Sequence, residues 1–420
     1  MEPRILERAE HPISRRDIHP NVLKVLYRLT MAGHTAGLVG GGVRDLMIGR
    51  KPKDFDIATS AHPQEIRDLF RNSRLIGRRF RLVHVFFGLQ NIEVSTFRKL
   101  SEAAAESHDP VAGHENTFGT PEEDAFRRDF TVNALFYDAE TFRVIDYTGG
   151  IDDLDARLIR TIGDPDLRVR EDPIRMLRAV RFAAKLGFEI EPATRDAIVP
   201  HCEELKRAAV PRLVEETFRT LAHVEAVRAL VLMAELGLLE VVLPELAEHF
   251  AADERAVDET TTVRNLRAYA RATATAQDPG PPRWVLLAAL FLDLHRCRRE
   301  SGGSDLHELV AELRRRGFAK AETERMRLAL DAFDQLIAPS RRTRRLRRRP
   351  YYEDARRFFE LMAPNYGAEA AAIAREFAPQ PERHYPQAAP PSNDHRRRRR
   401  RHRRGRRRPD STTTPPLPSA

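Results

Sequence analysis

The amino-acid sequence predicts an α+β protein in which a mixed α/β region is followed by helices alone. Between residues 1 and 150, short β-rich runs alternate with amphipathic stretches, so a mixed β-sheet with packed helices is expected there. After residue 151, apolar residues recur at three- and four-residue spacing, which is typical of helices buried along one face. From about residue 379 the chain becomes rich in Pro, Arg and Ser, a composition that favours disorder.

The first region is read element by element from its periodicity. The predicted strands are Ala36 to Val39, a run around Phe55, Leu82 to Phe87, Ile92 to Phe97, and Arg143 to Asp146. The predicted helices are Val22 to Leu29, Pro63 to Arg71, and Ala125 to Leu135. Residues 99 to 122 are rich in Ala, Ser, Glu, Gly and Pro without periodicity, so we expect a mobile surface loop there.

The rest of the folded chain is expected to be helical. The helical stripes cover residues 172–187, 211–223, 225–236, 282–297, 305–335 and 352–377. Breaks fall at Pro244 and in the Pro- and Gly-rich stretch 277–282. We therefore divide the chain into a head (1–150), an all-α neck (151–245), an all-α body (246–380) and a disordered, basic tail (381–420).

The charge of the chain is concentrated in the tail. The formal net charge is +9, and eleven arginines lie between residues 396 and 408, so the remainder sums to −2. A basic balance of this size favours a polyanionic partner. Because the folded part is close to neutral, its basic patches must be local.

Cysteine content and hydropathy exclude several classes of protein. The two cysteines, Cys202 and Cys297, lack CxxC spacing and paired histidines, which argues against a zinc site and a disulfide scaffold and fits a reducing cytoplasm. The N-terminus has no apolar core of a secretory signal. The longest apolar run, Trp284 to Leu292, is shorter than the roughly 20 residues of a membrane span and predicts a buried helix. We expect a cytoplasmic protein without membrane contact.

A glycine-rich turn follows the first predicted strand. Gly40, Gly41 and Gly42 let the backbone approach a ligand closely, and helix-opening amides can bind phosphate. Arg44 and Asp45 lie just inside the helix that follows, and all five are candidate nucleotide-binding residues. Three glycines alone are more often an ordinary tight turn, so the neighbouring motifs decide the interpretation.

The segment Asp54-Phe55-Asp56 supplies two carboxylates at a spacing of two. In a strand, residues i and i+2 share one face, so the carboxylates point the same way and repel each other. Divalent ions relieve this repulsion, and Mg²⁺ (or Mn²⁺) favours carboxylates together with substrate phosphates. Two metals bridged by Asp54 and Asp56 can activate an attacking 3′-hydroxyl and stabilise the leaving pyrophosphate. An isolated pair of this kind is more often a solvated turn, but its position after the glycine turn favours the metal site.

A third catalytic carboxylate is expected on a neighbouring element, and two candidates stay open. Glu93 lies on the strand Ile92 to Phe97, which could pair beside the strand of the aspartates. Asp129 lies in the segment RRDFTVN. The alternatives are an outward-facing strand residue for Glu93 and a structural salt bridge to an arginine for Asp129.

The same segment offers further polar groups to a nucleotide. Arg128 could meet a triphosphate, because guanidinium forks match phosphate oxygens, and Asn133 could meet the ribose. The alternative interpretation is a helix start with a charged first turn.

Residues 171–181 predict a helix that presents a base-reading pair. Asp172 followed by Pro173 is typical of a helix N-cap with Pro at the first helical position. Asp172 and Arg175 are three residues apart and share a face, so an acceptor and a planar donor can imitate the Watson–Crick edge of a base. Arg178 and Arg181 continue around the helix toward phosphate or primer. The alternative is a capped surface helix with a salt-bridge ladder.

These segments, in this order, resemble the class II nucleotidyltransferases, which include bacterial poly(A) polymerases and CCA-adding tRNA nucleotidyltransferases. The resemblance covers about residues 35–225 and rests on GLVGGGVRDLMIGRKPKDFDIAT, IEVSTFR, EEDAFRRDFTVNALFYD, YTGGIDDL and EDPIRMLRAVRFAAKLGF. It implies a nucleotidyltransferase head before the helical neck and body. It also implies metal binding by Asp54 and Asp56 and base reading by Asp172 and Arg175, and Glu93 and Asp129 match acidic positions of the family motifs.

Two features favour the poly(A) polymerase branch, which adds AMP from ATP to RNA 3′ ends without a template. Residues 70–85 are similar to the poly(A) polymerase form of this stretch, and so is the arginine-rich C-terminus. The basic run 341–349 is a second RNA-facing candidate. The candidate RNA-binding residues are Arg341, Arg342, Arg344, Arg345, Arg396, Arg397 and Arg398.

Other functions stay open beside this one. A CCA-adding enzyme would use the same fold and metal site, whereas a non-catalytic RNA-binding protein would keep only the fold, and the intact pair Asp54/Asp56 argues against the latter. A membrane or DNA-packaging protein would use only the tail. The expected substrates are ATP and RNA 3′ ends, with a role in RNA turnover, RNA-decay factors as partners, and a monomeric state.

Overall fold

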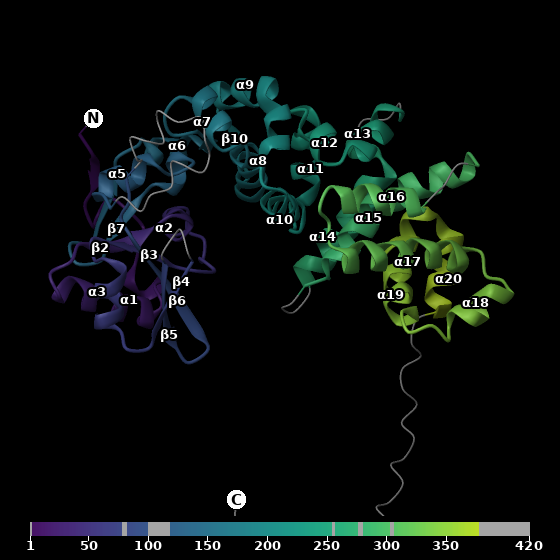
Figure 1. The fold of residues 1–420 in the computed structure, drawn as a ribbon, viewed down its shortest axis with the longest axis horizontal. Coiled ribbons are helices and arrows are strands. Elements are labelled where there is room, and N and C mark those ends of the chain that lie inside the picture. The colour runs from purple at the N-terminus through teal and green to yellow at the C-terminus, as the bar shows by residue number, and fades with distance from the viewer. Residues whose placement is uncertain are drawn as a thin grey trace, which may run out of the picture. The chain divides into compact units, whose positions relative to one another are not determined.

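A mixed β-sheet forms the N-terminal part of the chain and helices form the rest in the computed structural model (Figure 1). The structure describes residues 2–77, 82–99, 118–253, 257–275, 280–302 and 306–377. Residues 1–376 make up one unit by their contacts, and residues 377–420 are separate from it. The predicted α+β class is therefore confirmed, whereas the domain boundaries at 150 and 245 stay predictions.

The large sheet of the described residues has eight strands in the order β1-β8-β7-β2-β3-β6-β5-β4. Strand β3 pairs with β6 in parallel, and the other neighbours pair antiparallel, so the sheet is mixed as expected. The strands are β1 (Arg4–Leu6), β2 (Ala36–Val39), β3 (Asp56–Thr59), β4 (Ser73–Ile76), β5 (Leu82–Phe87), β6 (Gln90–Thr96), β7 (Phe136–Asp138) and β8 (Arg143–Asp146).

The two central strands that carry the site are the most deeply buried. All four residues of β2 are buried, as are the last three of β3, which is typical of strands covered on both faces. Gly37 in β2 is required there, because an added Cβ would lie 2.4 Å from the Phe136 ring and 2.6 Å from the Tyr137 carbonyl oxygen. Tight packing of β7 on β2 thus fixes the strand that leads into the glycine turn.

Short helices cover the sheet and connect its strands. Helix α1 contacts β2, and α3 contacts β4 and β5, with both helices lying on the sheet in Figure 1. The buried residues of α1 recur at three- and four-residue spacing, as the sequence predicted. The helical elements of the head are η1 (Arg15–Asp17), α1 (Pro20–Met31), α2 (Gly41–Met47), α3 (Pro63–Leu69), α5 (Pro121–Phe126) and η2 (Thr131–Asn133).

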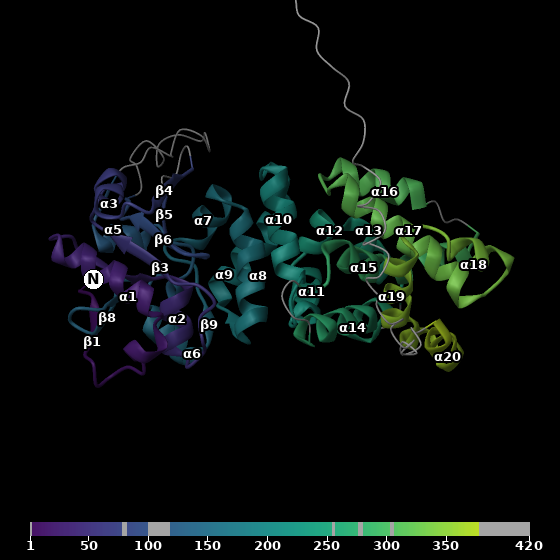
Figure 2. The same cartoon turned by 90° about the horizontal axis from the view of Figure 1, so that it is seen from below.

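Helices follow one another through the neck and body, with one small two-stranded parallel sheet of β9 and β10 (Figure 2). The elements up to residue 251 are α6 (Gly150–Ala156), β9 (Leu158–Ile159), α7 (Pro165–Glu171), α8 (Ile174–Leu186), β10 (Glu189–Ile190), α9 (Pro192–His201), η3 (Cys202–Arg207), α10 (Val210–Leu221), α11 (Ala226–Glu235), α12 (Leu238–Val242) and α13 (Pro244–Ala251). The remaining elements are η4 (Val257–Glu259), α14 (Thr261–Thr275), α15 (Arg283–Glu300), α16 (Leu306–Arg315), α17 (Lys320–Ile337), α18 (Arg341–Leu346), α19 (Tyr352–Met362), η5 (Ala363–Tyr366) and α20 (Ala368–Phe377).

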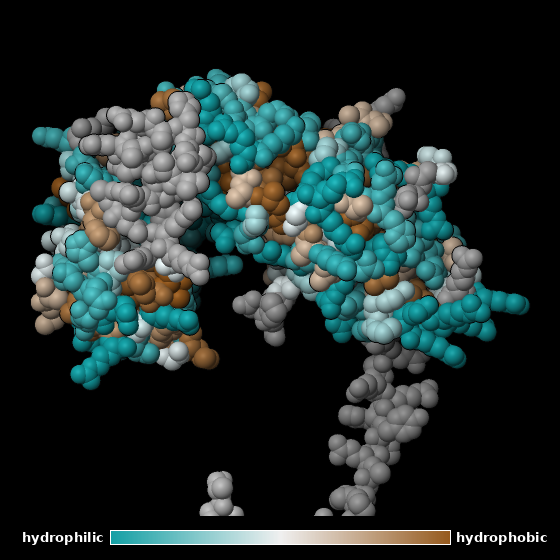
Figure 3. Space-filling model, in the orientation of Figure 1, coloured by the Kyte–Doolittle hydropathy of each residue, from teal (hydrophilic) through white to brown (hydrophobic). Residues whose placement is uncertain are grey.

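Helix α15 is the buried helix that the apolar run predicted. Every residue from Trp284 to Leu292 is buried, and α15 packs between α14 and α17. Within the described residues, no helix is long and apolar enough to cross a membrane. The face shown in Figure 3 is mostly hydrophilic, and its hydrophobic surface gathers in limited patches.

Three expected elements differ in the structure. The helix predicted over Ala125 to Leu135 is wrong, because α5 ends at Phe126 and the chain then forms only the short turn η2. The stripe 305–335 is two helices, separated at Gly317, whose φ of +89° is left-handed. The stripe 352–377 is likewise divided, between Pro364 in η5 and Gly367 at φ +105°.

Some predictions fall outside the described part of the chain. The expected loop 99–122 lies mostly on residues 100–117, and the expected tail lies within residues 378–420. The last residues of that loop are ordered differently from the expectation, since Phe118 bridges to Arg98 and α5 begins at Pro121.

Candidate active site

The glycine turn brings the backbone against the paired carboxylates. Strand β2 ends at Val39, Gly40 adopts a φ of +73°, and α2 starts at Gly41. An added Cβ on Gly40 would lie 3.3 Å from an Arg128 nitrogen and 3.6 Å from Asp56 Oδ2. The left-handed conformation and this close approach both favour glycine.

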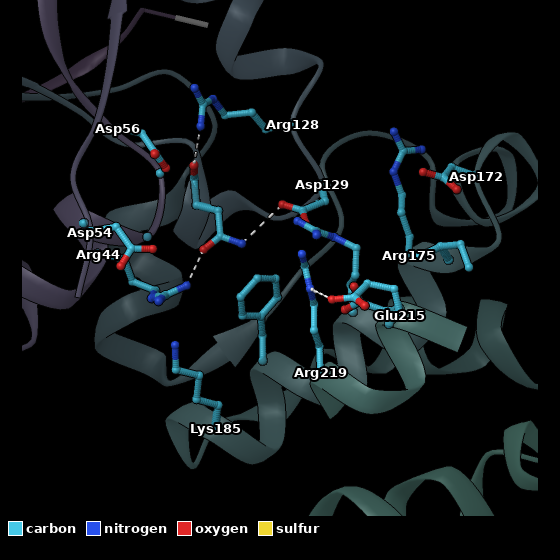
Figure 4. A pocket seen from close by; sticks show the side chains of 18 of the residues that line it. Arg44, Asp54, Asp56, Arg128, Asp129, Asp172, Arg175, Lys185, Glu215 and Arg219 are labelled. Atoms are coloured by element: carbon cyan, nitrogen blue, oxygen red, sulfur yellow. Dashed lines mark hydrogen bonds and ion pairs between the residues drawn. The ribbon is translucent and has the colours of Figure 1, made fainter. Parts of the chain in front are cut away.

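Asp54 and Asp56 lie at the start of the neighbouring strand. Asp56 is the first residue of β3 and pairs with Val39 of β2 on one side and Glu93 of β6 on the other. Asp54 precedes the strand by two residues, so the strand predicted around Phe55 does not include it, but both carboxylates line the same cavity (Figure 4). Phe55 between them is half-buried, and its ring lies 3.5 Å from the position of a Cβ on Gly42.

The surroundings of Asp56 raise the pKa of its carboxyl to about 6. The largest cause is burial by the protein on most sides, although the side chain reaches solvent through the cavity, and the charges of Glu93 and Asp54 add to it. Arg128 opposes the shift only in part. A site that disfavours its own negative charge is stabilised by a cation, and these oxygen donors fit a hard divalent ion such as Mg²⁺.

The two candidates for the third carboxylate have different surroundings. Glu93 on β6 is the register partner of Asp56 on β3, so both side chains leave the sheet on the same face. The Glu93 Oε2 atom lies 3.5 Å from His84 Nε2. Asp129 lines the cavity, but its oxygens accept hydrogen bonds from Arg178, from Asn133 Nδ2 at 3.2 Å and from the Phe130 amide at 2.8 Å. Which of the two completes a metal site stays a prediction, and Glu93 is the one beside Asp56.

Asp129 is held ionised by its partners. Burial by itself raises the pKa of Asp129, but the charge and hydrogen bonds of Arg178, with those of Asn133 and the Phe130 amide, outweigh it and lower the pKa. The Arg178 Nε atom lies 2.8 Å from Asp129 Oδ2. The salt bridge that the sequence left open for Asp129 is therefore present, and it connects the head to α8.

We expect Arg178→Met to lower the free energy of unfolding by roughly 1.5–3 kcal/mol at neutral pH, because a buried carboxylate loses its charged donor. The lowered pKa of Asp129 means that the pair stabilises the fold above about pH 4, and that this stability is lost as the pH falls through the folded-state pKa. Urea unfolding at pH 7 and pH 3 measures both effects. An equal loss at the two pH values would contradict the role of the pair.

A network of hydrogen-bonded polar side chains lies at the wall of the cavity. Arg44 is 2% exposed, pairs with Asp45 Oδ1 at 2.6 Å and donates to Asn133 Oδ1 at 2.6 Å. Arg128 binds Asp124 at 2.9 Å and donates to the Asn133 carbonyl oxygen at 3.3 Å. The four candidate nucleotide-binding residues Arg44, Asp45, Arg128 and Asn133 all line the cavity, but their hydrogen bonds mainly join α2, α5 and η2 to one another.

The pair predicted to read the base lies across the cavity from the aspartates. In Figure 4, Asp54 and Asp56 are on one side, Asp172 and Arg175 on the other, with Asp129 between them. The predicted N-cap is wrong: Asp172 is the C-cap that follows α7, and Pro173 is the N-cap of α8, which begins at Ile174. The Asp172 side chain is instead turned toward α10, where it accepts from Arg212 at 2.9 Å.

Arg175 is held in place by the residues before it. Its Nη1 atom donates to Glu171 Oε2 at 2.7 Å and to the Arg168 carbonyl oxygen at 2.8 Å. Arg168 also pairs with Glu171, at 2.7 Å. The guanidinium of Arg175 is thus oriented before any ligand arrives, which lowers the entropy lost on binding.

The cavity has a volume of about 830 Å³, within the range of small-ligand sites. Arg178 lines it, whereas Arg181 pairs with Glu216 at 2.6 Å and is not among the lining residues. The sequence missed the charged face of α10, whose i, i+3, i+4, i+7 spacing was the available signal. The lining residues that the sequence did not identify are Lys53, Arg127, Ile174, Phe182, Lys185, Pro211, Arg212, Glu215, Glu216 and Arg219.

The candidate RNA-binding arginines lie away from this cavity or outside the described residues. Arg341, Arg344 and Arg345 are exposed on α18, and the side chain of Arg342 is not described. Arg396, Arg397 and Arg398 fall outside the described part of the chain. The exposed face of α18 fits the predicted contact with phosphates, which stays a prediction.

Carboxylates suited to a divalent ion, facing a charged hydrogen-bonding pair across one cavity of nucleotide size, define the class of nucleotidyltransferases. Two family models match in the same region. Residues 36–160 match the poly A polymerase head domain, and residues 187–250 match the probable RNA and SrmB-binding site of polymerase A. The chain has the class II nucleotidyltransferase fold, and its sequence is similar to those of bacterial poly(A) polymerases and CCA-adding enzymes.

Curated relatives come from both branches of this family. Poly(A) polymerase I of Escherichia coli is 48% identical over 253 residues, which cover 59% of this chain and 54% of that protein. Poly(A) polymerase I of Haemophilus influenzae is 41% identical over 62% of this chain and 60% of its own length. The CCA-adding enzyme of Bacillus velezensis is 40% identical over 52% of this chain and 54% of its own. The chain therefore spans about half the length of the curated relatives it matches.

Solved structures share the fold over more of the chain. The Bacillus stearothermophilus CCA-adding enzyme in complex with CTP covers 86% of this chain and 82% of its own at 28% identity, with a TM-score of 0.62. The Thermotoga maritima CCA-adding enzyme complexed with tRNA covers 89% of this chain and 85% of its own at 19% identity, with a TM-score of 0.58. The second likeness concerns the fold alone.

Proposed function

We propose that this protein adds AMP from ATP to RNA 3′ ends without a template, with divalent metal ions bound at Asp54 and Asp56. The observation that carries the proposal is the cavity in which these carboxylates face Asp172 and Arg175. The identity to poly(A) polymerases I of 48% and 41% favours adenylate addition over other uses of this fold.

Each residue of the cavity has a role that follows from its position. Asp54 and Asp56 would hold Mg²⁺, which supplies charge neutralisation at the attacking 3′-oxygen and the leaving pyrophosphate. Arg128 and Lys185, both at the cavity wall, present positive charge to the triphosphate. Arg178 orients Asp129, which in turn fixes Asn133 beside the glycine turn.

The pair Asp172/Arg175 selects bases by their Watson–Crick edge. Adenine presents an amino donor and a ring-nitrogen acceptor, which match the carboxylate of Asp172 and the guanidinium of Arg175. Guanine and uracil present a carbonyl oxygen opposite the carboxylate, so they leave charged groups unpaired and are rejected. Cytosine shows the same donor–acceptor order as adenine, so the size of the cavity has to separate ATP from CTP.

The test is incubation of the purified protein with a short RNA, Mg²⁺ and each of the four nucleoside triphosphates in turn. We expect long products with ATP and at most short products with CTP, GTP or UTP, read as product lengths on a gel. A wholly inactive protein that still binds RNA would support the non-catalytic alternative.

CCA addition is the second candidate, because the base-reading pair accepts cytosine as well as adenine. The identity of 40% to a CCA-adding enzyme adds to this observation. A tRNA without its 3′ end distinguishes the two functions. Addition of two C residues and then one A would replace the proposed polyadenylation by CCA addition.

The arginine tail is expected to tether RNA. Eleven arginines between residues 396 and 408 attract phosphates through counterion release, with a contribution to the salt slope of about −0.7 for each phosphate contacted on a single strand. Deleting residues 390–420 should weaken RNA binding and flatten the plot of log affinity against log salt. Extension of short primers at saturating RNA should stay nearly unchanged. An unaltered slope would show that the tail does not bind RNA.

A further inference from the structure

A second hollow lies in the body, away from the nucleotide cavity. It has a volume of about 740 Å³ and is lined by residues of α13, α15 and α16. Two of its lining residues, His249 and Cys297, carry the side chains that transition metals prefer. The proposed reaction does not use this hollow, although its lining residues on α13 fall within the range 187–250 that matches a probable RNA and SrmB-binding site.

The lining residues His249 and Cys297 meet a third potential ligand, Asp293, beside the hollow. His249 comes from α13, and Asp293 and Cys297 come from α15, where their spacing of four places them on one face of the helix. One imidazole nitrogen, one carboxylate oxygen and the thiol sulfur all lie within 4.8 Å of one another. His249 Nε2 is already 3.3 Å from Asp293 Oδ2, so the two helices are held in the arrangement that brings the ligands together.

Burial makes this cluster different from scattered surface groups. The side chains of His249 and Asp293 are 9% and 8% exposed, whereas Cys297 is exposed at the edge of the hollow. Two ligands are therefore fixed by packing, and the third is reached from solvent. Fixed ligands with one open side match the demands of metal entry and binding.

We propose that His249, Asp293 and Cys297 form a binding site for Zn²⁺. A thiolate, an imidazole and a carboxylate are a ligand set for zinc, whereas Mg²⁺ takes oxygen ligands alone, so the two sites of this protein select different metals. Three protein ligands leave a fourth position for water. The metal cross-links α13 to α15. It stabilises the folded body, because the three ligands come together only in the native state, so the ion binds that state and not the unfolded chain.

The sequence pointed away from zinc because the ligands are distant along the chain. His249 lies 44 residues before Asp293, so no short ligand motif is visible. Only the packing of α13 on α15 brings the histidine to the face of the cysteine. This proposal does not depend on the reaction that the head catalyses.

The experiment uses the full-length protein after removal of metal with a chelator and dialysis. Titration with Co²⁺, a spectroscopic substitute for zinc, should give a thiolate-to-cobalt charge-transfer absorption at one equivalent, and added Zn²⁺ should abolish it. Carboxylates in the head do not produce this absorption, because it requires a sulfur ligand. Zn²⁺ should also raise the melting temperature of the metal-free protein, and this rise should persist when the head is already saturated with excess Mg²⁺.

The variants separate this site from other thiols. Cys297→Ser should remove the charge-transfer band and the zinc-dependent rise in melting temperature, and His249→Gln should weaken Co²⁺ binding at least about tenfold. The matched control is Cys202→Ser, which changes the other cysteine, on η3, and should behave like the unaltered protein. Absence of the band from the unaltered protein, or its persistence in Cys297→Ser, would overturn the proposal.

Discussion

Replacing either Asp54 or Asp56 with alanine is expected to abolish nucleotide addition, with a loss of at least about 10³-fold in rate. Each change removes a charged oxygen donor from the place where the attacking hydroxyl and the triphosphate must meet, and a loss of about 4 kcal/mol in transition-state stabilisation corresponds to that factor. The fold should persist, because both side chains line the cavity and belong to no buried core. Primer extension at saturating ATP and Mg²⁺ measures the effect.

The matched control is Asp68→Ala, an exposed carboxylate on α3 that accepts a hydrogen bond from Gln64 of the same helix. It removes the same charge from the head and should leave extension unchanged. RNA binding by the Asp54 and Asp56 variants should also persist, since the candidate RNA contacts lie elsewhere. If either variant extends the primer at a rate near that of the unaltered protein, Asp54 and Asp56 are not metal ligands.

The glycine turn and the aspartate pair could be predicted from the sequence, because each depends on residues only a few positions apart. A strand that ends at Val39, a left-handed glycine after it, and two aspartates at i, i+2 are all properties of a few consecutive residues. The structure confirms that they meet, since β2 and β3 are neighbours in the sheet. Strand β6 was likewise predicted from the sequence, and its pairing with β3 puts Glu93 beside Asp56.

Side-chain partners were less predictable, since they depend on how distant helices pack. Asp172 before Pro173 fits an N-cap locally, yet the carboxylate binds Arg212, forty residues further along the chain. Asp129 could be read as a catalytic group or a salt bridge, and only the position of α8 decides that Arg178 reaches it. Periodicity finds the buried face of a helix but gives no information about which helix it faces.

The same limit explains why several short elements were missed. Helices α7 and α9 are short and begin at Pro165 and Pro192, so they offer too few turns for a visible stripe. Strand β7 has three residues and forms because Gly37 leaves room for Phe136. Such elements are stabilised by their neighbours and carry little signal of their own.

Arg175→Ala is expected to reduce both the rate with ATP and the preference for ATP over GTP and UTP. The change removes the donor for the adenine ring nitrogen and leaves Glu171 without one of its two arginine partners. Loss of a charge-assisted hydrogen bond of about 1.5–3 kcal/mol corresponds to a fall of roughly 10- to 100-fold in the ratio of kcat/KM values for ATP and UTP. Single-nucleotide addition to a short RNA gives these ratios directly.

The ratio of ATP to CTP should respond differently from the ratio of ATP to UTP. Because adenine and cytosine present the same donor–acceptor order to Asp172 and Arg175, Arg175→Ala weakens both and should change their ratio by less than about threefold. The control Arg170→Ala removes an exposed arginine whose Nε donates to the Asp166 carbonyl oxygen within α7, and should alter neither ratio. If Arg175→Ala lowers the rate with all four nucleotides by one common factor, the side chain positions the helix and does not read the base.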